Sequence, residues 1–233
     1  MTTTTRTELS NLLVLFEDNH LIAVQKRVGD LVQGDETGDA PLSDIIKDYL
    51  KVTYDKPGAV FLGVIHRLDR PTSGIVLFAK TSKALTRMNE QFKNRETEKT
   101  YWAMVKGCPN PTAQSLIHYL KRNPKNNTSK AYPKPVDDAK EARLDFKVIQ
   151  QLDNYSCLEV HLHTGRHHQI RSQLAAIGFP IKGDLKYGAD RSNPDGGISL
   201  HAVRLIFTHP VTKERIQLEA KPEHDALWRE ILL

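Results

Sequence analysis

The densest group of reactive side chains lies within residues 63–74, Gly-Val-Ile-His-Arg-Leu-Asp-Arg-Pro-Thr-Ser-Gly. Asp69 stands there between Arg67 and Arg70, and Pro71 follows. Because a proline biases the preceding residue toward an extended conformation, the segment is expected to be a loop between strands. The adjacent cations are expected to lower the pKa of the Asp69 carboxyl, which suits a nucleophile or an electrostatic catalyst. The alternative is an aspartate that closes a turn.

A second candidate is the stretch 161–171, His-Leu-His-Thr-Gly-Arg-His-His-Gln-Ile-Arg. The pattern predicts a strand that ends at His163, a turn, and then a helix. Main-chain N–H groups at the helix start, together with Arg166 and Arg171, could cradle an anion or a carboxylate. Four histidines also raise the possibility of a metal site. The stretch holds no acidic or cysteine partner to complete a ligand set, so the sequence predicts no metal.

Tyr101 and Trp102 form a third candidate. On a strand, neighbouring side chains point to opposite faces, so one ring is expected in the core and the other at the surface. The alternative is that one of these rings is a stacking platform for a base. The sequence contains no P-loop, no G-x-G-x-x-G and no G-x-S-x-G, the usual signatures of nucleotide hydrolysis, dinucleotide redox chemistry and hydrolase-elbow chemistry. Cys108 and Cys157 do not indicate a disulfide framework.

The charge is unevenly distributed. The 233 residues carry a net charge of +5. Residues 1–60 have a net charge of −4, residues 61–191 of +10, and residues 192–233 of −1. This favours either a basic face for a polyphosphate partner or a solvated lysine-rich surface. The apolar runs are too short to span a membrane and the N-terminus lacks a secretory pattern, so a cytoplasmic protein without membrane contact is expected.

Hydrophobic patterning predicts an α+β fold, because many strands are joined by hairpin-length links and helices are few, which argues against a βαβ repeat. A polar stretch, 123–138, is expected to be a mobile basic loop. Helices are predicted near 42–50, from Thr81 or Ser82 to about 94, at 167–177 and near 225–232. Strands are predicted at 12–16, 21–24, 74–79, 101–105, 115–120, 144–149, 156–163, 200–207 and 215–218.

Several of these stretches together resemble one family. Residues 66–74, His-Arg-Leu-Asp-Arg-Pro-Thr-Ser-Gly, resemble the H-R-L-D-x-x-T-S-G signature of the RluA-type pseudouridine synthases. The opening hairpin 16–24, the Lys99-Thr-Tyr101 motif, the 163–171 motif with 180–184 and 187–188, and 200–202 match in the same order. The resemblance covers about residues 10–220. One departure is Lys26-Arg27, where the family usually has Lys-Pro, and this affects loop stiffness more than chemistry.

The resemblance implies isomerisation of uridine in RNA to pseudouridine, with neither a metal nor an organic cofactor. Asp69 then attacks the anomeric carbon or assists glycosidic cleavage. Tyr101 packs on the uracil and serves the deprotonation, Arg171 pairs with the aspartate, and Arg67 fills the gap left by the flipped nucleotide. Leu200 is expected to line the uracil pocket. Extrusion of the base requires unstacking, for which an arginine wedge and a basic surface compensate in part.

The expected partner is RNA, a stem-loop of rRNA or tRNA, bound by a monomer. Residues 1–10 are predicted to be a disordered or extended tail, and residues 11–233 a pseudouridine synthase catalytic domain. Its fold is expected to be a mainly antiparallel mixed sheet with flanking helices around a central cleft, without the extra N-terminal RNA-binding domain of longer relatives. The predicted RNA contacts are His66, Arg67, Arg70, Thr72, Lys121, Arg122, Lys125, Lys130 and Arg166.

Two other functions fit part of the pattern. A catalytically idle RNA-binding or RNA-remodelling protein would keep the fold and the basic surface, although the combination of Asp69, Tyr101 and Arg171 favours an enzyme. A nucleosidase would also act on a glycosidic bond. Glycosidases generally place two acids around that bond, and here only Asp69 stands in a suitable motif.

Overall fold

The computed structural model describes residues 6–34, 38–222 and 226–232. The chain divides into two compact units, which are treated separately below. The first unit comprises residues 1–97 and 202–222, and the second unit comprises 98–201 and 223–233. Of the predicted tail 1–10, residues 1–5 lie outside the described part, whereas Thr7 is buried and donates from its amide and its hydroxyl to Asp30. The described residues include no helix long and apolar enough to cross a membrane.

The first unit is built on a sheet in which β1, β2, β4 and β10 are neighbours in that order, with β3 beside β4 and β11 beside β10. The pairs β1–β2, β2–β4, β3–β4 and β10–β11 are antiparallel. The elements are η1 (Leu9–Asn11), β1 (Val14–Glu17), β2 (Leu21–Lys26), α1 (Leu42–Thr53), β3 (Gly63–Val64), β4 (Ser73–Ala79), α2 (Ser82–Asn94), β10 (Leu200–Thr208, of which 202–208 belong here) and β11 (Arg215–Glu219).

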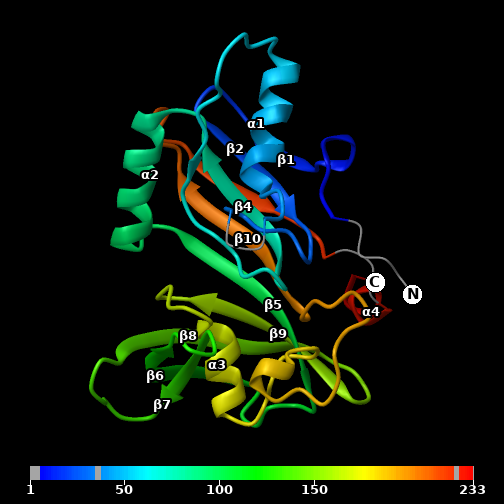
Figure 1. The fold of residues 1–233 in the computed structure, drawn as a ribbon. Coiled ribbons are helices and arrows are strands. Elements are labelled where there is room, and N and C mark those ends of the chain that lie inside the picture. The colour runs from blue at the N-terminus through cyan, green and yellow to red at the C-terminus, as the bar shows by residue number, and fades with distance from the viewer. Residues whose placement is uncertain (1–5, 35–37, 223–225, 233) are drawn as a thin grey trace. The chain divides into compact units, whose positions relative to one another are not determined.

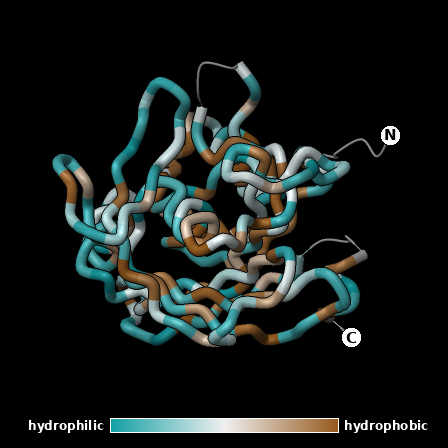
Figure 2. The backbone as a smooth tube through the Cα atoms, turned by 90° about the horizontal axis from the view of Figure 1, so that it is seen from below, coloured by the Kyte–Doolittle hydropathy of each residue, from teal (hydrophilic) through white to brown (hydrophobic). Residues whose placement is uncertain are grey.

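The core of this unit lies between the sheet and α2. Alternate residues of β2 and β4, such as Leu21 and Leu77, pack with Ala84 and Met88 of α2, the helix drawn beside these strands in Figure 1. The intervening residues of these strands, such as Ile22, are buried as well. Both faces of β2 and β4 are therefore covered, which explains their continuous apolar runs. Figure 2 shows that many of the protruding loops are hydrophilic.

The helices of the first unit confirm the sequence predictions. α2 begins where the side chain of Thr81 accepts a hydrogen bond from the amide of Ala84 at 3.2 Å, an N-cap that satisfies an otherwise unpaired donor. It ends at Arg95, whose backbone is left-handed. α1 extends three residues beyond the predicted 42–50, to Thr53.

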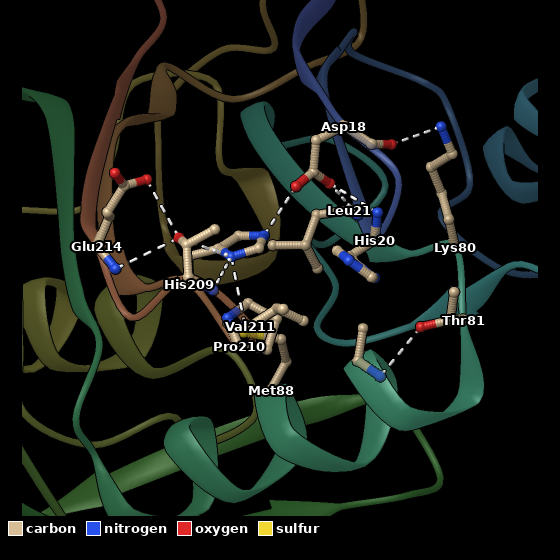
Figure 3. A network of polar contacts seen from close by, with 12 residues as sticks. Asp18, His20, Leu21, Lys80, Thr81, Met88, His209, Pro210, Val211 and Glu214 are labelled. Atoms are coloured by element: carbon tan, nitrogen blue, oxygen red, sulfur yellow. Dashed lines mark hydrogen bonds and ion pairs between the residues drawn. The ribbon is translucent and has the colours of Figure 1, made fainter.

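A buried polar contact joins the β1–β2 turn to the β10–β11 turn (Figure 3). Asp18 Oδ1 accepts from the amides of His20 and Leu21, each at 2.7 Å, and Asp18 Oδ2 lies 2.8 Å from His209 Nε2. Nδ1 of His209 accepts from the amide of Thr212 at 3.0 Å, so the ring proton belongs on Nε2, facing the carboxylate. His209 thus fixes the two turns of the first unit to one another.

The second unit contains a sheet with strand order β5-β9-β8-β6-β7, in which all these neighbours are antiparallel. The mainly antiparallel sheet predicted from the sequence is therefore confirmed in both units. The elements are β5 (Glu98–Lys106), β6 (Ala113–Asn123), β7 (Thr128–Tyr132), β8 (Lys140–Gln151), β9 (Tyr155–Leu162), α3 (Gln169–Ala176), η2 (Leu185–Tyr187) and α4 (Ala226–Leu232).

The prediction of a mobile loop over 123–138 is wrong for residues 123–132, which belong to a strand hairpin. Residues 128–132 form β7, which pairs with the end of β6 in a hairpin that turns at residues 124–127. Asn127, with φ of 49°, supplies the left-handed residue of that turn. The strand escaped the pattern analysis because it is polar, and its main-chain pairing with β6 places it rather than hydrophobic burial.

The helix predicted at 167–177 is present but shorter. α3 begins at Gln169, since His168 has a left-handed backbone with φ of 51°, and the chain reverses at Gly178, with φ of 86°. Most of α3 is buried, including the polar residues Gln169, Arg171 and Gln173. The helix predicted near 225–232 is α4, although residue 225 lies outside the described part; its Trp228 packs against Met104 and Cys157.

Replacing Gly74 by alanine should destabilise the first unit strongly. Gly74 has φ of 119°, and a Cβ there would lie 2.4 Å from the carbonyl oxygen of Ala202 in β10. Gly178→Ala is the matched control, because Gly178 also has a positive φ but a Cβ added to it would meet no atom within 4 Å among the described residues. We expect Gly178→Ala to cost about 1–2 kcal/mol and Gly74→Ala clearly more, measured by urea unfolding. Equal costs would show that the approach to Ala202 is not constraining.

Candidate active site and RNA contacts

Asp69 lies in the loop that connects β3 to β4 in the first unit. The predicted loop between strands is present. Within it Arg67 is exposed, Leu68 is buried, and Asp69 is half-buried. The amide of Thr72 donates to the carbonyl of Asp69 at 3.0 Å, so a tight turn follows the aspartate. Leu68 anchors the loop by its burial, Arg67 is exposed to solvent, and Asp69 is partly exposed.

Lys26, at the end of β2, holds this loop from inside. Its side chain is fully buried, and Nζ donates to the carbonyls of Arg27 at 2.9 Å, Arg70 at 3.0 Å and Thr72 at 2.7 Å. Burial lowers the pKa of Lys26 to about 7, while the negative charges of Asp30 and Asp69 act in the opposite direction. The sequence motif contained Lys26, but pattern analysis assigned it no role because its importance depends on carbonyl groups 44 and 46 residues away.

Three other residues of this loop are predicted to contact RNA, and the structure shows the burial or the contacts of each within the protein. His66 Nε2 accepts from the amide of Leu77 at 3.1 Å, and its ring stacks on Phe92 with centroids 4.9 Å apart. Arg70 forms an ion pair with Asp39 at 2.5 Å. Thr72 is buried, and its hydroxyl has no hydrogen-bond partner within the described part of the chain. That these three residues also contact RNA stays a prediction.

Tyr101 and Leu200 belong to the second unit. Tyr101 lies on β5, opposite Val160 of β9, and is buried with 9% exposure. Its neighbour Trp102 points to the other face of the strand and packs near Met104. Leu200 begins β10 and is also buried. Their predicted contacts with uracil stay predictions.

Arg171 is held by a carboxylate that pattern analysis did not assign. Its Nε donates to Asp184 Oδ2 at 2.7 Å and its Nη2 to Asp184 Oδ1 at 2.9 Å, with both side chains buried. The guanidinium carbon lies 5.0 Å from the centre of the Tyr187 ring. A bidentate pair fixes the plane of the guanidinium as well as its position. Asp69 belongs to the other unit, and its predicted pairing with Arg171 remains a prediction.

The predicted phosphate contacts of the second unit are mostly exposed and lie along the β6–β7 hairpin. Lys121 stands directly opposite Lys130 in the ladder, an arrangement in which like charges repel. Lys121 has Asp138 as a distant partner at 3.5 Å, and Lys130 lies over the Tyr132 ring. Lys125 is exposed in the turn, Arg122 donates to Asn127, and Arg166 donates from Nε to the carbonyl of Glu141.

The four histidines of 161–168 have separate partners. His161 Nε2 lies 3.1 Å from Glu159, and His163 Nε2 lies 2.5 Å from Asp145. His167 Nδ1 contacts Ser129 Oγ at 2.9 Å, and His168 Nδ1 contacts the Tyr187 hydroxyl at 2.8 Å. Within the described ranges, no group of three or more His, Cys, Asp or Glu side chains is arranged to hold a metal ion.

The profile of the family described as RNA pseudouridylate synthase matches residues 20–176. The chain belongs to the RNA pseudouridylate synthase family. This confirms the function predicted from the sequence: the enzyme is an intramolecular isomerase that forms pseudouridine in RNA. The match spans the Asp69 loop, Tyr101 and Arg171.

Relatives agree with this assignment. The chain is 33% identical to the ribosomal large subunit pseudouridine synthase C of Escherichia coli O157:H7, over 93% of this chain and 68% of that protein. It is 32% identical to the protein of the same name from Vibrio vulnificus, covering 89% of this chain and 65% of that one. It is 31% identical to the tRNA pseudouridine synthase C of Pasteurella multocida, over 95% of both chains.

Solved structures support the fold. The structure of human RNA pseudouridylate synthase domain containing 4 is similar with a TM-score of 0.76 at 22% identity, covering 94% of this chain and 91% of that one. Human RNA pseudouridylate synthase domain containing 1 gives a TM-score of 0.73 at 23% identity. The pseudouridine synthase fold predicted from the sequence motifs is therefore confirmed.

Replacing Lys26 by methionine should impair both stability and pseudouridine formation. The three carbonyls would lose their common donor, and an unsatisfied buried polar group costs about 1–3 kcal/mol. We expect a loss of about 2 kcal/mol in the free energy of unfolding and a lower rate under single-turnover conditions. Lys51→Met, at an exposed site on α1, is the control and should change neither. Wild-type rates in Lys26→Met would mean that the loop does not need this clamp.

Arg171→Ala should destabilise the second unit by about 3–5 kcal/mol, because it leaves the buried Asp184 carboxylate without its partner. Arg204→Ala removes one side of a half-exposed pair with Glu219 and should cost at most about 1 kcal/mol. Urea unfolding measures both. If the double variant Arg171→Leu/Asp184→Leu is much more stable than Arg171→Ala, the loss stems from the unpaired carboxylate, and equal instability would contradict this explanation.

Proposed function

We propose that the enzyme isomerises a specific uridine in a structured RNA, a stem-loop of rRNA or tRNA, and that Asp69 is its essential carboxylate. The observation that carries this proposal is the Asp69 loop. A half-buried aspartate beside an exposed arginine sits on a loop clamped by a fully buried ammonium group. Such rigid support is what a catalytic group requires, since small misplacements cost rate.

In the proposed reaction the C1′–N1 bond of the uridine breaks, a C1′–C5 bond forms, and the proton on C5 is transferred away while N1 regains one. Atoms balance without water, metal or organic cofactor. Asp69 acts at C1′, either as a nucleophile or by assisting cleavage. Tyr101 packs on the uracil, Leu200 lines its pocket, and Arg171 neutralises the aspartate. Their burial supports these roles, because apolar surroundings strengthen electrostatic interactions with the substrate.

A base inside a stem-loop must leave its stack before it can react, at a cost of a few kcal/mol. We assign the interactions that offset this cost to Arg67, which is exposed in the Asp69 loop, and to the basic hairpin β6–β7. The opposed Lys121 and Lys130 support this assignment, because a polyanion relieves the repulsion between them. The names of the relatives include both ribosomal and transfer RNA as targets, so both classes are candidates.

Asp69→Asn should abolish pseudouridine formation while leaving RNA affinity within about threefold of wild type, because the amide keeps the shape but loses the charge and basicity. Asp48→Asn, an exposed site on α1, is the control. The assay maps pseudouridine in total RNA from cells that lack the gene and carry each variant. Sites lost in Asp69→Asn and retained in Asp48→Asn identify the target RNA. Retained turnover in Asp69→Asn would remove Asp69 from the mechanism, and release of free uracil would indicate a nucleosidase.

A further inference from the structure

The turn of the β6–β7 hairpin brings together side chains that no motif predicted to meet. Asn127, at the left-handed position of that turn, accepts through Oδ1 from Arg122 Nη2 at 3.1 Å, and His167 Nε2 lies 3.1 Å from the same oxygen. The main-chain carbonyl of Asn127 accepts from Lys186 Nζ at 3.4 Å. Three basic residues from β6, the segment before α3, and η2 therefore converge on one neutral residue.

The hydrogen-bond roles follow from the donor types. Arginine only donates, so Asn127 must present its carbonyl oxygen to Arg122, and His167 must donate from Nε2 to that oxygen. His167 uses Nε2 for Asn127 and Nδ1 for Ser129, so it holds Asn127 in place rather than offering a donor to a ligand. Arg122 and Lys186 each use only one of several N–H donors here, so both keep donors for a ligand.

Further contacts fix this cluster in the second unit. The Tyr187 hydroxyl, one residue after Lys186, accepts from the amide of Ser129 at 2.7 Å and contacts His168 Nδ1 at 2.8 Å. The rings of His167 and His168 are stacked with centroids 3.8 Å apart. Arg171 lies over the Tyr187 ring. The basic residues are thus held in place before any ligand arrives. Tyr187 lies between this cluster and Arg171.

We propose that Arg122 and Lys186, gathered by Asn127, which His167 holds in place, form a binding site for one backbone phosphate of the substrate RNA. Two permanent cations held around neutral oxygens repel each other, and an anion is the partner that relieves this repulsion. Arg122 and Lys186 are exposed and accessible to RNA. This site rests on the proposed function for its ligand, and it adds Lys186 to the RNA contacts predicted from the sequence and His167 as a positioning residue.

The first test removes charge. The probe is a fluorescein-labelled RNA stem-loop, and fluorescence anisotropy gives its Kd at several salt concentrations. For Arg122→Gln/Lys186→Gln we expect an affinity roughly tenfold lower at low salt and a salt slope reduced by about 0.8, as loss of one neutralised phosphate implies. The matched control Lys83→Gln/Lys93→Gln removes the same charge from exposed positions of α2 and should change Kd less than about twofold. The charge-preserving variant Arg122→Lys/Lys186→Arg should keep most of the affinity.

The second test leaves the net charge unchanged. Asn127→Gly keeps the left-handed backbone but removes the amide that gathers Arg122 and His167. It should weaken RNA binding about threefold, whereas Asn126→Gly, at the neighbouring exposed asparagine, should not. Melting temperatures confirm that each variant is folded. Equal effects in the cluster variants and their controls would overturn the site.

The same wild-type preparation is assayed for pseudouridine formation, which separates the two proposals. If the wild-type protein binds RNA through the cluster but forms no pseudouridine in the stem-loop or in tRNA and rRNA transcripts, the phosphate site stands and the proposed target fails. If it forms pseudouridine and the cluster variants match their controls, the target stands and the phosphate site is rejected.

Discussion

One buried ammonium group, that of Lys26, holds the loop that carries Asp69, the proposed essential carboxylate. The antiparallel register places Lys26 of β2 opposite Gly74 of β4, so the lysine side chain reaches back over the loop that precedes β4. Its three carbonyl partners include those of Arg70 and Thr72, which closely follow Asp69. Gly74 meets a second constraint, because only a residue without Cβ permits the approach of β4 to Ala202. The loop's position thus depends on strand pairing around it.

In the second unit a buried carboxylate, that of Asp184, holds the buried Arg171 side chain. Arg171 is buried, and a buried charge is costly unless it is paired and hydrogen-bonded. Asp184 satisfies two of its N–H donors, and Tyr187 covers the guanidinium face. The same Tyr187 is bonded to β7 through Ser129, so the hairpin that carries exposed cations is tied to the element that positions Arg171. The side chains of this unit that are proposed for catalysis and for RNA binding therefore share one supporting network.

The two units contribute different chemistry to the pseudouridine synthase. The first contains Asp69, the proposed essential carboxylate, and the exposed Arg67, while the second contains the buried Tyr101 and Arg171, proposed to act with it, and the basic hairpin β6–β7. Most charges of the hairpin are partnered by neutral oxygens, rings or a distant carboxylate. Such cations retain donors and repel one another, which favours a polyanionic substrate. In the proposed phosphate site, Arg122 and Lys186 are two such cations, both bonded to Asn127.

Ordered motifs and local periodicity were sufficient to predict the family, the mainly antiparallel α+β fold, α1 and α2, and the candidates Asp69, Tyr101 and Arg171. They were not sufficient for β7, since a polar strand is defined by pairing with β6 rather than by hydrophobicity. The roles of Lys26, Asp184 and Asn127 emerged from the folded chain alone. Each acts on groups distant in sequence, and hydrogen-bond partners at such separations follow from strand register and turn geometry, which no local pattern encodes.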